Sequence, residues 1–194
     1  MLKKTATKQP EEQSVTLGRR FGSYLIDWYL GALCTSLPIS LASQKLYGTM
    51  LTQNLFKFPE KIGILAAALA LVFAFFYFVI VPTYIYPGQT LGKKWCHLKI
   101  VRHDQQPVGL KTLFLRQVIG MFLIEGVLIT ASSIGWQLVQ LLTGVNLVHI
   151  MMYVGIVISV ISSLLVAFGK KHQAIHDYIA QTKVIKVSRE TLAK

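Results

Sequence analysis

The sequence predicts an all-α integral membrane protein with four transmembrane helices. Its composition, its long apolar stretches and its uneven distribution of basic residues are the observations behind this prediction. Hydrophobic residues make up 53% of the 194 residues and charged residues 14%, whereas soluble domains contain about 45–50% and about 25%. The mean hydropathy is +0.52. Four stretches are long and apolar enough to cross a hydrocarbon core of about 30 Å as helices, and they cover about residues 24–43, 62–86, 113–135 and 147–168.

The basic residues predict the orientation of these four stretches. The net charge is +12, and 17 of the 20 lysines and arginines lie in three segments: the amino tail, the loop after the second stretch with the entry to the third, and the carboxyl tail. Four crossings put these three segments on one side, so the positive-inside rule predicts that both termini are cytoplasmic. The same charge predicts contact with anionic lipid head groups. No nucleic-acid partner is predicted, because no reading motif accompanies the charge.

The first element of the membrane domain follows a polar segment, residues 1–15, which predicts a flexible tail. Stretch 24–43 comes after two arginines and ends near "SLAS", a combination that also fits a cleaved signal peptide. The carboxylate of Asp27 inside the apolar run and the long polar lead favour a retained span.

A buried ion pair is predicted between the first and third stretches. Asp27 and Arg116 each lie about one turn inside a span that enters from the cytoplasmic side, so they are expected at the same depth. Arg20 is seven residues before Asp27, on the same helical face, and is a second candidate partner. The alternative is that Asp27 reaches the interface without a partner.

The loop between the second and third stretches predicts a small hairpin at the cytoplasmic surface. "WCHLKIVRHD" has the alternation of a short strand and "DQQPVG" that of a turn, and the later strand-like segment "YIAQTKVIKV" is a candidate partner for "LKIV". The preceding "GQTLGKK" lacks the full spacing of a phosphate loop, so no nucleotide or other cofactor is predicted. Its candidate motif residues are Gly88, Gln89, Thr90, Gly92 and Lys93.

Glu125 is the candidate proton or cation site. It lies nine residues beyond Arg116 in the third stretch, which places it roughly 13 Å deeper in a straight helix. No Lys, Arg or His is expected at that depth, so the carboxyl group is expected to be protonated at neutral pH. Either it donates a hydrogen bond to a neighbouring helix, such as the one carrying Ser159, Ser162 and Ser163, or it binds and releases a proton or cation during transport.

The fourth stretch carries small residues at every fourth position, namely Gly155, Ser159 and Ser163. Such a stripe predicts a close helix contact, within the bundle or across a homo-oligomer. After this stretch the membrane domain, predicted over residues 16–187, gives way to a basic tail, residues 188–194.

Three sequence blocks resemble the RDD family of small prokaryotic membrane proteins. They are "RRFGSYLIDWYL" with Arg20 and Asp27, "GQTLGKKWCHLKIV" followed by "PVGLKTLFLRQ" with Arg116, and "HQAIHDYIAQTKVI" with Asp177. The chain departs from the family at His97, where glycine is frequent, and at Ala180–Thr182, where "AGT" is frequent. The resemblance implies a multi-pass protein of the bacterial cytoplasmic membrane whose motif residues are these two arginines and two aspartates. It also implies a link to ion transport, including sodium/proton exchange, which is suggested for some members.

Asp177 follows the last stretch by nine residues and is expected at the cytoplasmic surface. We expect it to hydrogen-bond the "GQTLGK" loop or to pair with Arg20. His172 and His176 are four residues apart, a spacing that could hold a metal on a helix, but the segment equally fits an amphipathic helix docked beneath the bundle. No metal site is predicted.

Two functions remain open from the sequence. One is a small ion- or proton-coupled transporter that uses Glu125, and the other is a non-catalytic scaffold or assembly partner of another membrane protein. An enzyme is not predicted, because no nucleophile–base set and no metal signature are present.

Overall fold

The computed structural model describes residues 15–126 and 130–187. The basic tail predicted over 188–194 lies outside the described residues, as does the flexible tail predicted over 1–15 except for its last residue.

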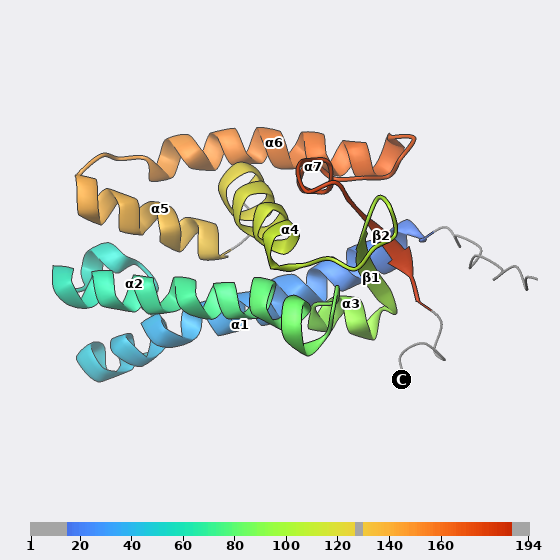
Figure 1. Ribbon diagram of the computed structural model, residues 1–194. Helices are drawn as coiled ribbons and strands as arrows, with labels where there is room; N and C mark the ends of the chain where they lie inside the picture. The colour runs from blue at the N-terminus through green and yellow to red at the C-terminus, as the bar shows by residue number, and fades with distance from the viewer. Residues whose placement is uncertain (1–14, 127–129, 188–194) are drawn as a thin grey trace, which may run out of the picture.

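Three helices are long and apolar enough to cross a membrane, and they run roughly parallel along the length of the molecule (Figure 1). Their unbroken apolar sequence is what predicts them, and the helices expected over 24–43, 62–86 and 147–168 are confirmed. They are α1 (Leu17–Tyr47), α2 (Glu60–Phe75) with its π-helical continuation η2 (Phe76–Ile85), and α6 (Val148–Phe168).

The prediction of a single straight helix over 113–135 is wrong. The chain forms α4 (Leu110–Phe114) with the π-helical η3 (Leu115–Glu125), and then α5 (Thr130–Thr143), which is bent by 69° from the first pair. In Figure 1 the α4–η3 helix crosses the bundle while α5 runs beside α2. The helix ends where Gly126 has a φ of +24°, and the Ser132 hydroxyl donates to the Phe122 carbonyl across the bend at 2.9 Å. Counted as one broken span, this pair brings the candidate spans to four.

A core of small and branched side chains packs α1, α2 and α5 at one end of the bundle. The alanines of α2 let the neighbouring helices approach closely, and the short 3₁₀ helix η1 (Leu55–Lys57) covers this end. The buried residues of this core are Ile39, Leu55, Phe58, Ala66, Ala67, Ala70 and Ile134.

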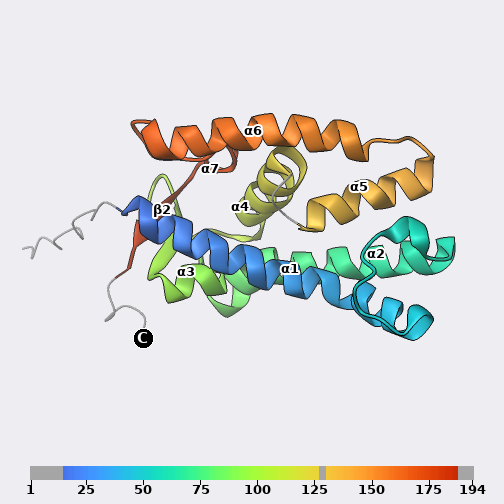
Figure 2. The same cartoon turned by 180° about the vertical axis from the view of Figure 1, so that it is seen from behind.

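The opposite end carries a small layer that we call the sheet end. It consists of α3 (Leu91–Trp95), β1 (Leu98–Arg102), α7 (Ile175–Ile179) and β2 (Thr182–Lys186). The two strands are antiparallel, with Ile100 opposite Val184, so the predicted pairing of "LKIV" with the last segment is confirmed. The predicted turn after β1 is tight, because Arg102 N–H donates to the Gln106 carbonyl at 3.0 Å. Figure 2 shows the start of α1 at the same end.

Candidate functional site

Asp27 is buried in α1, 3% exposed, and four donors converge on its carboxylate. Lys93 Nζ lies 3.0 Å from Oδ2, which also accepts from the Thr90 hydroxyl at 2.5 Å. Oδ1 accepts from the Tyr77 hydroxyl and from Gly92 N–H, each at 2.9 Å. The predicted pairing of Asp27 with Arg116 or Arg20 is therefore wrong, and its cation comes from the loop after the second span.

The loop motif consists of the residues that dock α3 onto α1. Gly88 has a φ of +78°, and a Cβ there would lie 2.5 Å from the Ile100 carbonyl. A Cβ on Gly92 would lie 2.5 Å from the Ser23 carbonyl and 2.8 Å from Asp27 Cγ, so only glycine permits this approach. Gln89 Nε2 donates to the Leu98 carbonyl at 2.7 Å and ties the loop to β1. Each of the five predicted motif residues thus has a structural contact.

Arg116 pairs instead with Asp177. Arg116 Nη2 lies 2.7 Å from Asp177 Oδ1, and the two side chains are 2% and 3% exposed. The Thr182 hydroxyl also donates to this carboxylate, at 3.1 Å. Burial alone would raise the pKa of Asp177, but the positive charge of Arg116, together with His176 and these hydrogen bonds, lowers it to about 2. The expected bonds of Asp177 to the "GQTLGK" loop or Arg20 are wrong.

Arg20 joins α1 to the carboxyl-terminal segment through backbone carbonyls. Its Nη1 donates to the His172 carbonyl at 2.5 Å, and its Nη2 to the Val184 carbonyl at 3.3 Å. Among the described residues no carboxylate forms an ion pair with Arg20. Of the four motif residues, the structure therefore brings together Arg116 and Asp177. Asp27 pairs with Lys93, and the hydrogen bonds of the Arg20 side chain within the described residues go to backbone carbonyls.

Glu125 lies against the start of α7. Its Oε1 accepts from the Ser162 hydroxyl at 2.7 Å and from His176 N–H at 3.0 Å, and its Oε2 lies 2.9 Å from His176 Nδ1. The expectation that no basic side chain shares its depth is wrong. The depth was counted along a straight helix, whereas η3 crosses the bundle and carries Glu125 to the sheet end.

His176 connects the Arg116–Asp177 pair with the carboxylate of Glu125. Its Nε2 lies 3.0 Å from Arg116 Nη2, and because a guanidinium only donates, Nε2 must accept. The proton of the neutral ring then sits on Nδ1 and is donated to Glu125, so this arrangement suits an ionised Glu125 rather than the protonated one expected. Sequence reasoning considered His176 only as a metal ligand. Its neighbour in sequence, Asp177, was the available signal that this histidine faces the bundle.

A cavity of about 420 Å³ lies beside this network, between α1 and α6. Arg20, Lys93, Arg116, Glu125 and Asp177 all line it. The three residues of the small-residue stripe of α6, Gly155, Ser159 and Ser163, have two different surroundings.

Gly155 in this stripe is buried, whereas Ser159 and Ser163 line the cavity and the Ser159 hydroxyl donates to the Glu125 carbonyl at 2.7 Å. Among the residues that the structure describes, no three His, Cys, Asp or Glu side chains converge as metal ligands would.

The comparisons with known proteins bear on the family. The family model described as the RDD family matches residues 15–181, a range that includes the first two blocks named above and most of the third, with Asp177. No curated protein and no solved structure matches the chain. With nearly the whole length of the chain matched, the protein belongs to the RDD family.

Proposed function

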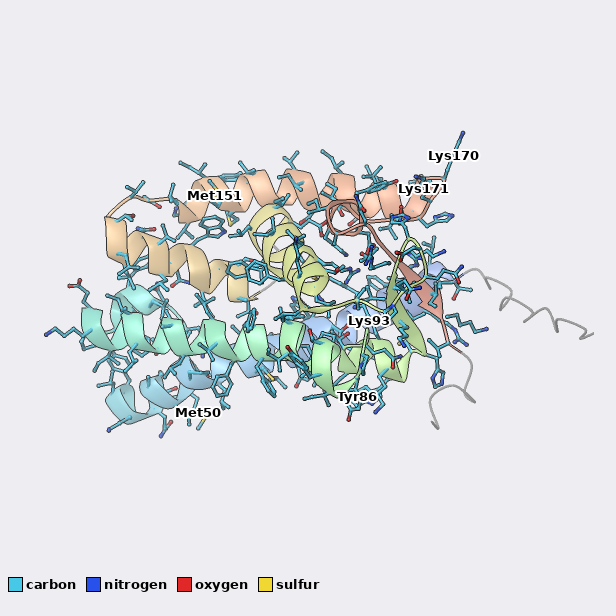
Figure 3. The ribbon with its side chains drawn as sticks, in the orientation of Figure 1. Met50, Tyr86, Lys93, Met151, Lys170 and Lys171 are labelled. Carbon is cyan, nitrogen blue, oxygen red and sulfur yellow. The ribbon has the colours of Figure 1, made fainter. Side chains whose placement is uncertain are left out.

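We propose that this RDD-family protein is a multi-pass protein of the bacterial cytoplasmic membrane, with both termini and the sheet end in the cytoplasm. The uneven distribution of basic residues supports this orientation. Lys93, Lys170 and Lys171 lie toward the sheet end in Figure 3. The basic residues between the first two spans are Lys45, Lys57 and Lys61. The connection between α5 and α6 has no lysine or arginine, and the first histidine after it, His149, lies in α6.

We further propose that the protein handles protons or small cations through Glu125 and His176. The observation that carries this proposal is that a carboxylate and an imidazole, 2.9 Å apart, line a cavity at one end of a membrane-type bundle. Both side chains are largely but not fully buried, 13% and 14% exposed. Ionisable pairs in such positions mark ion and proton pathways in membrane proteins.

The chemistry of the pair supports coupling to a conformational change. A second proton on His176 would occupy Nε2, which faces the Arg116 guanidinium at 3.0 Å. Two donors cannot share that contact, so proton uptake has to separate His176 from Arg116 or move Arg116 with Asp177. A cation bound at Glu125 would likewise displace the imidazole N–H. Either event changes how α7 sits on η3.

A vesicle assay tests this function. The full chain is reconstituted into liposomes that contain a pH-sensitive dye, and proton movement is recorded after a sodium gradient is imposed. We expect sodium-driven proton movement for the native chain and its loss in Glu125→Gln. Glu60→Gln, the same change at an exposed position, is the matched control and should behave as the native chain. Unchanged flux in Glu125→Gln would remove this residue from the mechanism.

The alternative is a non-catalytic scaffold or assembly partner, and one observation favours it. Asp27 and the Arg116–Asp177 pair are satisfied by groups of the same chain, as expected for charges that hold a shape. Native vesicles without any proton or sodium movement would favour this role. Crosslinking in native membranes should then recover a defined complex with another membrane protein or a second copy.

A further inference from the structure

The cavity between α1 and α6 contains polar groups that the network of Glu125, His176, Arg116 and Asp177 does not use. Arg20 Nε and the Ser23 hydroxyl are buried and have no hydrogen-bond partner within residues 15–126 and 130–187, and both residues line the cavity. Ser23 is 2% exposed. The two residues are three positions apart on α1 and therefore share a face. A buried donor without a partner costs free energy, which a bound acceptor would recover.

Arg20 forms no ion pair among the residues that the structure describes, although the charge of Asp177 lies near enough to interact with its guanidinium. Lys93 and Arg116 line the same cavity, but each has its own carboxylate, Asp27 and Asp177. Arg20 has only the carbonyls of His172 and Val184. Glu125 belongs to a different wall, formed by η3 and α7, and its two oxygens already take part in three hydrogen bonds. The open position beside Arg20 and Ser23 therefore favours an anion.

The remaining walls are apolar and are formed by two membrane-type helices. Leu17 and Phe21 come from α1, Val166 and Ala167 from α6, and Met121 from η3. Residues of both helices line the cavity, and α1 and α6 run apart from each other in Figure 2. An anionic group bound at Arg20 would thus have apolar surface beside it, with lipid outside the two helices.

We propose that this cavity binds an anionic amphiphile, whose head group contacts Arg20 Nε and the Ser23 hydroxyl and whose chain lies along the apolar walls. A volume of about 420 Å³ suits a head group and the first part of a chain, since ligand pockets span about 300–1,000 Å³. The rest of the chain leaves between α1 and α6. The Glu125–His176 pair lines another wall of the same cavity, but the proposed contacts with Arg20 and Ser23 do not require ion handling, and the experiment below measures lipid retention alone.

Native mass spectrometry of the full chain tests the proposal. The purified protein is delipidated, incubated with an equal mixture of phosphatidylglycerol and phosphatidylcholine, and scored for retained lipid. We expect phosphatidylglycerol to be retained in preference, and Arg20→Gln to weaken its binding about tenfold, as loss of a charged hydrogen bond predicts. Arg19→Gln removes the same charge from an exposed neighbour and should leave binding unchanged.

A second variant covers the possibility that Arg20→Gln loosens the carboxyl-terminal segment. Ser163→Trp places a large side chain in the cavity from α6 and leaves the native Arg20 side chain, which donates to the His172 and Val184 carbonyls, in place; it should lose the lipid while the protein keeps its melting temperature. Three results would overturn the proposal. They are equal losses in Arg19→Gln and Arg20→Gln, full retention in Ser163→Trp, and displacement of phosphatidylglycerol by an equal concentration of inorganic phosphate.

Discussion

Asp27 anchors the loop after the second span to the first span, since its carboxylate accepts from Lys93, Thr90, Gly92 and Tyr77. These donors come from two separate parts of the chain, η2 and the start of α3. A carboxylate buried in an apolar helix is tolerated when it is paired and hydrogen-bonded, and here the pairing fixes the position of α3. The residue therefore contributes to the arrangement of elements rather than to an open site.

Asp27→Asn should destabilise the protein by about 3–5 kcal/mol, because it leaves the partly buried Lys93 ammonium without its counter-charge. The measurement is the thermal unfolding of the purified chain in detergent, together with its abundance in the membrane. Asp104→Asn is the matched control, since Asp104 pairs with Arg102 at the surface with both side chains about half exposed, and exposed pairs contribute about 0–1 kcal/mol. Equal melting temperatures for the two variants would contradict this assignment.

The Arg116–Asp177 pair predicts an acid-dependent loss of stability. The pKa of Asp177 is lowered to about 2 in the folded chain, against about 3.9 for an unperturbed aspartate. A lowered pKa contributes stability that is complete above pH about 4 and is lost as the pH falls toward 2. Melting temperatures across this interval should fall more steeply for the native chain than for Asp177→Asn. Parallel curves would show that Asp177 is not the titrating group.

The identities of the buried polar residues could be predicted from the sequence, but their pairs could not. Asp27, Arg116 and Glu125 were found because ionisable groups in apolar stretches need partners. Pairing by depth failed because it assumed that each stretch is a straight helix perpendicular to the membrane.

The two places where the chain departs from the family have an unusual backbone conformation. His97 has a φ of 55° and Gln181 a φ of 51°, so both lie in the left-handed region that favours the glycine frequent at these two places.

At the scale of elements, the apolar runs of α1, α2 and α6 were sufficient to predict these helices, because each run is long and continuous. The third run also passes as a membrane span by length and composition, but an average over its residues does not detect a bend. Arg116, Gln117 and Glu125 interrupt it, and the chain turns after Glu125 toward α5. β1 and β2 were predictable as strands from their β-branched apolar residues, and their pairing followed because they are the two strand-like segments at the same end of the bundle.

The crossing of η3 over α7 predicts a specific glycine requirement. A Cβ on Gly120 would lie 2.6 Å from His176 Cβ and 2.8 Å from its Cα, so Gly120→Ala has to push α7 away from η3. We expect a loss of about 1–3 kcal/mol, although alanine normally stabilises a helix interior relative to glycine. Gly18→Ala in α1, where nothing lies within 4 Å, is the control and should be neutral or stabilising in thermal unfolding. A Gly120→Ala protein as stable as this control would mean that α7 does not dock on η3 here.

At the scale of the whole molecule, the two ends of the bundle differ in chemistry. The sheet end combines the buried ionic pairs, the cavity and most of the basic residues of the described chain. The opposite end has the apolar core around Leu55 and Phe58, a short connection, and three lysines. The positive-inside rule assigns the end with more basic residues to the cytoplasm. The proposed orientation can therefore be tested by labelling one residue at each end of the molecule.

Met50 and Lys170 are suited to this test because they lie at opposite ends of the molecule (Figure 3), and Met50 is 53% exposed. Both native cysteines, Cys34 and Cys96, are free thiols and are first replaced by serine and alanine. In intact cells a membrane-impermeant maleimide should label Met50→Cys, since the connection between the first two spans is expected outside the cytoplasm. It should label Lys170→Cys only after lysis, because four crossings return the chain to the side on which it began. Labelling of Lys170→Cys alone in intact cells would reverse the orientation, and labelling of both positions would mean an even number of crossings between them.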